Sequence, residues 1–178
     1  MSLIEKRYAE ALVDISVQKG MIDAYQEEFK DLVDLYNTHS DLKLLLINPQ
    51  IKAEAKKELI TKLYKNKMKT ELLNFVLLLI DKGRIKFLPS ILDEYIQLAN
   101  KHKNILDMTI ISAAPLEDTQ INALKEKYKA LYNSSAVKAN IEVDSSLIGG
   151  VKVRIGDKVI DGTVKGRLDS LKQLIIEN

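Results

Sequence analysis

The glycine-rich stretch LIGGVKVRIGDKVIDGTVKGRLDSL, from Leu147 to Leu171, is the part of the chain whose residue types could bind a phosphate group. Five of the seven glycines lie in it, among lysines and arginines. A P-loop has the spacing G-x-x-x-x-G-K-[ST], because its backbone N–H groups face the phosphates while the lysine reaches the terminal one. Here five residues separate Gly150 from Gly156, and Asp157 stands where the lysine is required. The dinucleotide pattern G-x-G-x-x-G is absent as well. The spacing therefore excludes both phosphate sites.

The other residue types that commonly carry chemistry are scarce or scattered. The chain has no cysteine, which removes disulfides, thiolate nucleophiles and metal sites with cysteine ligands. Its two histidines, His39 and His102, have no partner at helical ligand spacing, and we expect both at the surface near helix ends. A small hydrolase built on two carboxylates is a further interpretation, but the 25 acidic residues offer no isolated pair with apolar flanks. We therefore assign no catalytic residue, no cofactor and no metal.

A β-hairpin explains the glycines better than a phosphate loop does. Apolar and basic residues alternate from Val151 to Ile155, and Gly156-Asp157 is a two-residue turn that supplies positive φ values between right-twisted strands. The second strand then runs to Ile160, and Asp161-Gly162 turns the chain toward a final helix that Thr163 could cap. Two interpretations remain for Gly149-Gly150, namely a bulge at the start of the strand or the close approach of another backbone segment.

The elements before this hairpin fall into two groups. Up to Asn104 the apolar residues recur at intervals of three and four, which is typical of amphipathic helices. Six helices are predicted, in the regions 2–19, 23–36, 40–48, 53–64, 70–82 and 87–99, and short polar connections join them. Residues 1–104 are thus predicted to form a helical bundle domain.

The fifth predicted helix differs from its neighbours because its run LLNFVLLLI is apolar on nearly all sides. Such a helix either lies at the centre of a bundle or has a second face that a partner covers. The sequence leaves both alternatives open.

From Ile105 the pattern changes to strand periodicity. Two alternating segments, 105–111 and 137–143, flank a helical stripe that includes Ile121, Leu124 and Tyr128, and the hairpin and final helix follow. Residues 105–178 are therefore predicted to form a small α+β domain with a mixed sheet. The fold class is mainly α, with an N-terminal six-helix bundle and this second domain.

Composition and charge limit the function classes. The net charge is only +2, whereas a nucleic-acid binder usually shows a concentrated basic face. A lysine-rich stretch from Lys52 to Lys69 is expected to be a solvated face. Together with the basic hairpin residues Lys152, Arg154 and Lys158, it keeps a nucleic-acid-binding protein as the alternative function. The longest apolar run is far shorter than the roughly 20 residues that cross a bilayer. Acidic residues near the start are unlike a transit or signal peptide, so we expect a cytoplasmic protein.

Several long segments resemble one protein family. GGVKVRIGDKVIDGTVKGRLDSLKQLI is similar to the C-terminal signature of the delta subunit of F-type ATP synthases, called oligomycin-sensitivity-conferring protein in mitochondria. RYAEALVDIS resembles the family's first helix, and NFVLLLIDKGRIKFLPSILDEY resembles its fifth and sixth helices. SAAPLEDTQINAL is similar to the family's entry into the second domain. The resemblance covers nearly the whole chain.

This resemblance implies a non-catalytic stator subunit that supports proton-driven ATP synthesis. The N-terminal domain would bind N-terminal helical segments of the alpha subunits at the top of the catalytic head. The C-terminal domain would bind the b subunits of the peripheral stalk. The protein would lie at the cytoplasmic face of a bacterial cell membrane, attached only through the complex, without a cofactor or nucleic acid. We expect a monomer when it is isolated.

The resemblance also implies two sets of site residues. Matching the first and fifth helices gives six partner-binding candidates, each of which could instead be ordinary core: Tyr8, Ala11, Ile15, Phe75, Val76 and Leu79. A helix held in a groove uses anchors at such helical spacing. Matching the C-terminal signature gives a structural motif of turns and one arginine that would pair with a carboxylate or a helix end: Gly149, Gly150, Gly156, Asp161, Gly162 and Arg167.

Overall fold

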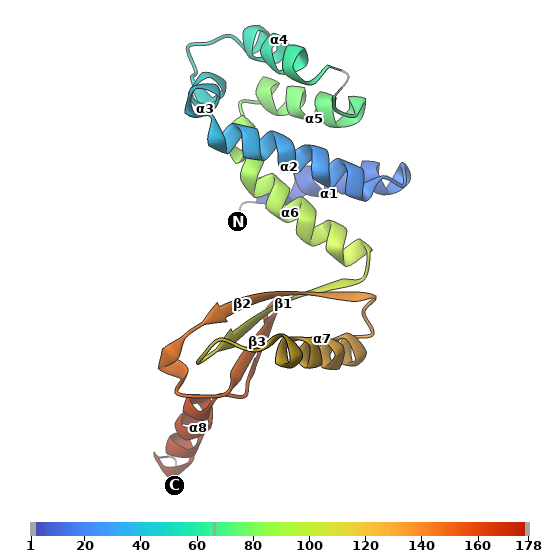
Figure 1. Cartoon of the computed structure of the whole chain (residues 1–178). Helices are drawn as coiled ribbons and strands as arrows, with labels where there is room; N and C mark the ends of the chain where they lie inside the picture. Colours follow the sequence, from blue (N-terminus) through green and yellow to red (C-terminus); the bar gives the residue numbers. More distant parts are fainter. Residues whose placement is uncertain (1–2, 66, 177–178) are drawn as a thin grey trace. The chain divides into compact units, whose positions relative to one another are not determined.

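The chain divides into two units between Ala99 and Asn100. The structure is a computed structural model that describes residues 3–65 and 67–176, with only the backbone described at 170, 171 and 173–176. Figure 1 shows helices alone in the first unit and a sheet with helices in the second. A mainly helical chain with a small mixed sheet is thus confirmed, and the division lies five residues before the predicted boundary at 104.

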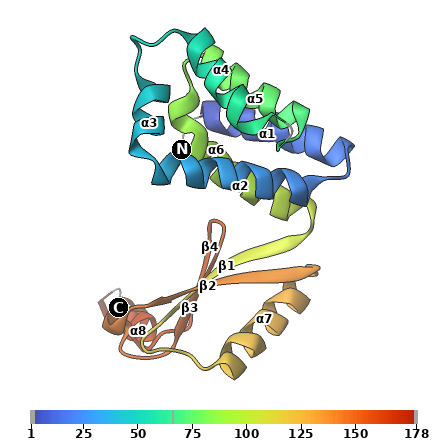
Figure 2. The same ribbon diagram turned by 45° about the horizontal axis from the view of Figure 1, so that its top comes forward.

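Within residues 3–65 and 67–104, six α-helices precede the first strand. They are α1 (Leu3–Gln18), α2 (Ile22–Thr38), α3 (Ser40–Ile47), α4 (Ala53–Tyr64), α5 (Thr70–Asp81) and α6 (Leu88–His102), and the short 3₁₀ helix η1 (Ile85–Phe87) joins the last two. In Figures 1 and 2, α4 and α5 lie side by side. The 3₁₀ turn was not predicted from the sequence.

Large aromatic side chains form the centre of the first unit. Phe29, Tyr36 and Tyr95 are almost completely buried, and the rings of Phe29 and Tyr95 meet edge to face with centroids 6.3 Å apart. The Tyr95 hydroxyl donates toward Ser16 Oγ at 2.9 Å and the carbonyl oxygen of Ile22 at 3.0 Å. These two partners stabilise the buried phenol of Tyr95, because an unsatisfied hydroxyl costs free energy. The stripe at helical spacing in each helix therefore faces one shared core.

The sequence predicts a solvated face for the lysine-rich stretch, and this prediction is wrong for two of its lysines. Lys56 is buried, and its ammonium group donates to the carbonyl oxygen of Asn48 at 2.7 Å. Lys57 is half-buried and pairs with Asp81 at 2.7 Å. Lys56 lies one turn before the core residue Ile60, so its long aliphatic stem packs inward while the charged head reaches a carbonyl at the end of α3.

The described residues of the second unit, up to 176, form a four-stranded mixed sheet and two α-helices. Its elements are β1 (Ile105–Ser112), α7 (Asp118–Tyr132), β2 (Ala136–Val143), the 3₁₀ helix η2 (Ser145–Leu147), β3 (Val151–Ile155), β4 (Lys158–Asp161) and α8 (Val164–Ile176). The strand order is β2-β1-β3-β4. β1 and β2 run parallel, as a helical crossover allows, and the two remaining pairs are antiparallel. The predicted hairpin between residues 151 and 161 is confirmed.

One face of this sheet makes the second core. Met108 and Ile110 of β1 and Val153 of β3 are buried, and Tyr128 of α7 packs against them. Figure 2 shows α7 along one side of the strands. The opposite face carries polar side chains, where Arg154 lies 4.0 Å from Glu142. Period-two alternation therefore places Met108, Ile110 and Val153 on the same face of the sheet, under α7.

The second unit begins within the last turn of α6, because a buried amide ties that turn to the sheet. Asn100 is 2% exposed, and its amide nitrogen donates to Asp107 Oδ2 at 2.7 Å. Its amide oxygen accepts from the ammonium group of Lys138 at 3.2 Å. Asn104, with a positive φ of 53°, ends the helix and turns the chain into β1. This network joins the last turn of α6 to β1 and β2 within the second unit.

Candidate partner-binding groove

An open groove of about 700 Å³ runs between α1 and α5 on the surface of the first unit. Its walls are mostly apolar and carry a few polar groups. The lining residues are Ile4, Arg7, Tyr8, Ala11 and Ile15 of α1, Glu71, Asn74, Phe75 and Leu78 of α5, and Arg84.

Helical spacing brings these residues together. The α1 residues stand at positions i, i+3, i+4, i+7 and i+11, and those of α5 at i, i+3, i+4 and i+7, so each set occupies one side of its helix. A separate stripe of α1, which includes Ala9, Leu12 and Val13, is buried in the core. Helix α1 therefore carries two apolar stripes, of which one faces the core and the other faces the groove.

Aromatic rings form the floor of the groove. Phe75 is 7% exposed, and its ring meets Tyr8 edge to face with centroids 6.0 Å apart. On the inner side it meets Phe29 at 6.1 Å in the same manner. Edge-to-face pairs are favourable because a positive ring edge meets a negative ring face. Contact with the core thus positions the Phe75 ring at the floor of the groove.

A helix-ending motif positions the arginine at one end of the groove. Gly83, with a φ of 65°, donates to the carbonyl oxygen of Ile80 at 3.0 Å, and the Arg84 amide donates to that of Leu79 at 2.8 Å. This is a Schellman motif, which requires a left-handed residue that glycine supplies without strain. The Arg84 side chain then lies over the Tyr8 ring, 5.5 Å from its centroid, and Nη1 donates to the Tyr8 hydroxyl at 3.2 Å.

An ion pair closes the other end of the groove. Lys19 lies 3.0 Å from Glu71 Oε1, and the buried Tyr25 hydroxyl donates to Glu71 Oε2 at 3.1 Å. The pKa of Glu71 is lowered by its own backbone N–H, by Lys19 and by Tyr25. Burial and the bond to Glu71 raise the pKa of Tyr25 to about 12. Glu71 is therefore a carboxylate near neutral pH whose charge already has a partner.

The structure separates the six partner-binding candidates into two sets. Tyr8, Ala11, Ile15 and Phe75 line the groove. Val76 and Leu79 are fully buried in the core, so neither side chain is accessible there. Sequence reasoning missed Ile4, Arg7, Glu71, Asn74, Leu78 and Arg84. Leu78 lies three residues after Phe75, and this spacing was the available signal for it.

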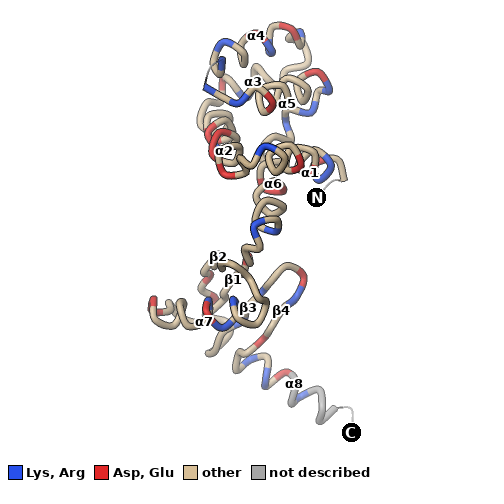
Figure 3. Tube along the Cα trace, turned by 90° about the vertical axis from the view of Figure 1, so that its right-hand side faces the viewer, with Lys and Arg blue, Asp and Glu red and all other residues tan. Residues whose placement is uncertain are grey.

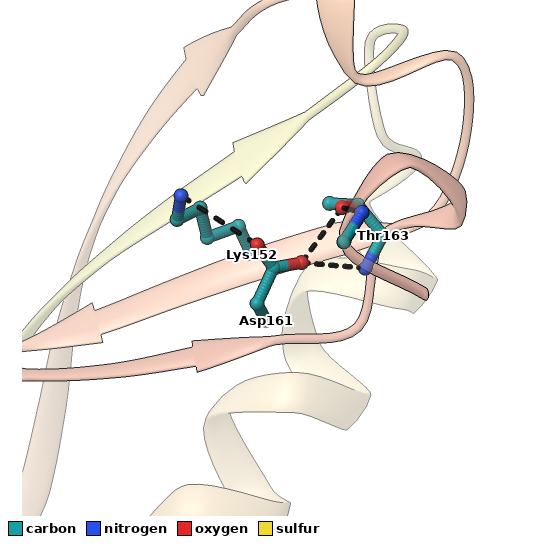
Figure 4. A network of polar contacts seen from close by, with 4 residues as sticks. Lys152, Asp161 and Thr163 are labelled. Carbon is teal, nitrogen blue, oxygen red and sulfur yellow. Dashed lines mark hydrogen bonds and ion pairs between the residues drawn. The ribbon is translucent and has the colours of Figure 1, made fainter. Parts of the chain in front are cut away.

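The C-terminal motif performs a structural task, which Figure 4 shows. Asp161 Oδ1 accepts from the Thr163 amide at 2.9 Å and from the Thr163 hydroxyl at 2.7 Å, and its other oxygen lies 3.6 Å from the ammonium group of Lys152. The Thr163 hydroxyl in turn accepts from the Gly166 amide at 3.0 Å. Thr163 is therefore the N-cap of α8, as predicted, and satisfies an amide in the first turn.

Two glycines of this motif permit a close backbone approach. A Cβ atom on Gly150 would lie 2.5 Å from the carbonyl oxygen of Gly162, and Gly150 has a φ of 84°. The Gly162 amide donates to the carbonyl oxygen of Val151 at 3.0 Å. Of the two interpretations of Gly149-Gly150, the close approach is therefore the one observed. In the hairpin turn Gly156 alone has a positive φ, whereas the sequence predicted more than one such value.

The motif's arginine was expected to pair with a carboxylate or a helix end. Arg167 is exposed in the second turn of α8, and it takes part in none of the ion pairs found within 3–65 and 67–176. The expected pairing is thus not observed in the described part of the chain.

The described residues offer neither a metal-binding cluster nor a membrane-spanning helix. No group of three or more histidine, aspartate or glutamate side chains there could hold a metal ion. No helix in that part is both long enough and apolar enough to cross a membrane. The two histidines are exposed at the ends of α2 and α6.

Comparison with known sequences identifies relatives over almost the full length. The family described as ATP synthase delta (OSCP) subunit matches residues 4–175. The ATP synthase subunit delta of Acetivibrio thermocellus is 47% identical over 177 residues, which are 99% of either chain. That of Ruminiclostridium cellulolyticum is 45% identical over 175 residues, covering 98% of this chain and 99% of the relative.

Solved structures with the same fold are more distant in sequence. One is a chain in the Toxoplasma gondii mitochondrial ATP synthase hexamer, with a TM-score of 0.76, 18% identity, and coverage of 99% of this chain and 98% of that one. Another is a chain of the Polytomella F-ATP synthase, with a TM-score of 0.54 and 22% identity over 58% of this chain and 91% of that one. At these identities the likeness shows a shared fold.

Proposed function

Because the chain belongs to the ATP synthase delta (OSCP) subunit family, we propose that the groove between α1 and α5 binds N-terminal helical segments of the alpha subunits of the catalytic head. The chain is a stator subunit of an F-type ATP synthase and is not a catalytic subunit. It contributes contacts to the complex, so its function depends on which surfaces it presents.

The groove is the observation that supports this proposal. Leu78 is 44% exposed and Ile15 is half-buried, although both belong to helices whose other stripes are in the core. An apolar groove along two helices fits an amphipathic helix that places anchors at i, i+3, i+4 and i+7. A bound helix would remove these side chains from water, which is favourable by about 25 cal/mol per Å² of apolar surface.

For the second unit, we propose that it binds the b subunits of the peripheral stalk. Exposed apolar side chains at the end of β2 and the start of α8 support this assignment: Ile141, Val143, Val164 and Leu168, each about half exposed. The double substitution Val143→Asp with Leu168→Asp should prevent co-purification with b subunits and leave alpha-subunit binding intact. If the b subunits still co-purify, neither set of exposed side chains is their contact.

The proposed location is the cytoplasmic face of a bacterial cell membrane, where the protein is attached through the complex alone and is a monomer when isolated. Its most similar relatives named above come from bacteria. The alternative function, nucleic-acid binding, has no support from the comparisons. In Figure 3 basic positions in the helical unit are interspersed with acidic ones, without a continuous basic track along a helix.

Calorimetric titration of the full chain with a peptide of the alpha subunit's N-terminal segment from the same complex tests the groove. We expect saturable binding with a negative heat-capacity change, because apolar surface is buried. Leu78→Asp should abolish binding and leave the fold intact, since this side chain is largely exposed. Leu44→Asp is the matched control, because Leu44 is 68% exposed on α3 and does not line the groove. Equal binding by both variants would contradict the proposal.

A further inference from the structure

We propose that Arg84 and Arg7 select an acidic side chain on the helix that occupies the groove, so that one carboxylate, together with the apolar stripe, decides which segment binds and in which direction it lies. This inference rests on the proposed function of the groove as a helix-binding site. It adds a charge requirement to an otherwise apolar contact.

The two ends of the groove differ in charge. Helices α1 and α5 run in opposite directions along it, since Lys19 after the end of α1 pairs with Glu71 at the start of α5 at 3.0 Å. At the opposite end, Arg84 stacks on Tyr8 in the second turn of α1. One end is therefore neutralised by its own ion pair, while the other end carries two arginines.

These arginines have no acidic partner within the part of the chain that the structure describes. None of the ion pairs among residues 3–65 and 67–176 includes Arg7 or Arg84. The only hydrogen bond found there for the Arg84 side chain goes to the phenol of Tyr8, which is uncharged. A guanidinium carries five N–H donors, so most of those on Arg84 remain available to a ligand.

The Arg84 side chain is also held in position before a ligand arrives. Its stacking on the Tyr8 ring and its bond to the hydroxyl restrict the long side chain, and the Schellman motif at Gly83 fixes its backbone. Less side-chain entropy is then lost when a carboxylate binds. A planar guanidinium also matches a carboxylate in a two-bond arrangement, which an ammonium group does not.

A bound helix would cover Arg84, and the loss of water from its guanidinium favours helices that carry a carboxylate at this point over helices that do not. Arg84 is half-buried already, so an apolar helix laid along Tyr8 and Leu78 would remove more water from it. A guanidinium that loses water without gaining a carboxylate is unfavourable. Helices with a neutral or basic residue at this point are therefore disfavoured, whereas a glutamate or aspartate side chain offsets the loss.

Three synthetic helical peptides test the inference on the full chain. All carry the same leucine and isoleucine stripe, and they differ in a glutamate flanking its N-terminal end, a glutamate flanking its C-terminal end, or glutamine at both places. We expect one of the two glutamate peptides to bind about tenfold more tightly than the glutamine peptide. The end that carries the effective glutamate reports the direction of the bound helix.

Substitutions then assign the preference to the arginines. Arg84→Gln should remove the preference and raise the affinity for the glutamine peptide, because no guanidinium then loses water without a carboxylate partner. Arg84→Lys should retain part of the preference. Arg7→Gln, at an exposed position of α1, should reduce the preference without affecting folding. Lys30→Gln, on the exposed side of α2, removes the same charge away from the groove and should retain the whole preference.

The outcomes distinguish this inference from the proposed function. If the wild-type chain binds all three peptides equally, or if Lys30→Gln lowers the preference as much as Arg84→Gln does, the charge selection is wrong and the apolar groove stands. If the chain binds none of them and does not bind the alpha-subunit peptide either, both proposals are wrong.

Discussion

The Arg84 guanidinium lies over the ring of Tyr8 and donates to its hydroxyl at 3.2 Å, although 76 residues separate the two in the sequence. This contact joins the first helix to the loop after the fifth. Both walls of the groove are thereby held at one end by a stacked, hydrogen-bonded pair, and at the other by Lys19 and Glu71.

Tyr8→Phe should lower the free energy of unfolding by about 0.5–1.5 kcal/mol, because it removes the hydrogen bond from Arg84 and keeps the ring. Tyr8→Ala should cost more, since the contact with the Phe75 ring is lost as well. Urea unfolding of both variants, followed by circular dichroism, measures the difference. Equal costs would show that the hydroxyl, and not the ring, is what stabilises this contact.

Leu79→Ala should mainly lower the free energy of unfolding, whereas Leu78→Ala should mainly weaken peptide binding. Leu79 is fully buried, so its truncation should cost about 2–5 kcal/mol of unfolding free energy. Leu78 is 44% exposed, and its truncation should cost less than about 1 kcal/mol and weaken peptide binding. Thermal unfolding and calorimetric titration of the same two samples check both halves. A stable Leu79→Ala variant with weakened peptide binding would place Leu79 in the groove.

Gly150→Ala should destabilise the second unit more than Gly156→Ala does. Both glycines have a positive φ, which costs an alanine about 1–2 kcal/mol. At Gly156 the added methyl group meets nothing within 4 Å, whereas at Gly150 it would lie 2.5 Å from a backbone oxygen. Overpacking of this kind adds about 1–3 kcal/mol. Comparison of the two unfolding midpoints in urea is the measurement, and equal midpoints would contradict the close approach.

Acid should weaken the junction between β4 and α8. The hydroxyl and amide of Thr163, with a smaller effect of Lys152, hold the pKa of the Asp161 carboxyl below its usual range. The folded chain then binds this proton less readily than the unfolded chain, so the stabilisation is present above about pH 4 and is lost as the pH falls through the lowered pKa.

Asp161→Asn should therefore lose less stability than the wild type between pH 7 and pH 3. Unfolding in urea at the two pH values gives the comparison. Asp157→Asn, in the exposed hairpin turn, is the control and should behave as the wild type does. If Asp161→Asn retains the full pH dependence, other carboxylates cause it.

Asn100→Ala should destabilise the second unit by about 1–3 kcal/mol, because both side-chain hydrogen bonds of a buried amide are lost and their partners remain. Asn122→Ala, at an exposed position of α7, is the matched control and should be close to neutral. Hydrogen exchange of the β1 amides reports the local effect. Unchanged exchange in Asn100→Ala would show that the network does not anchor the sheet.

Residue spacing predicted the helices, the strands and the hairpin, because each depends on local periodicity. Spacing could not predict which of Leu78 and Leu79 lines the groove, because the run LLNFVLLLI is apolar on nearly all sides. Packing against Phe29 and its neighbours is what orients this helix. Lys56 was misplaced for a related reason, because its burial depends on a carbonyl at the end of another helix.

The place of Arg84 in the groove could not be predicted from the sequence. Its position follows from the left-handed turn at Gly83 and from a ring 76 residues away, and neither relation is visible in a local pattern. The close approach at Gly150 has the same origin, since it depends on the path of the chain at Gly162.

The order of the elements along the chain has a consequence for biosynthesis. Every described residue that lines the groove lies between Ile4 and Arg84. The sheet, by contrast, begins with its interior strand β1, which must wait for β2 and for β3 before both of its sides are paired. Domains fold as units from the N-terminus during synthesis at about 5–20 residues per second. On the ribosome, the helical unit can therefore present a finished groove while the strands that complete the sheet are still being translated.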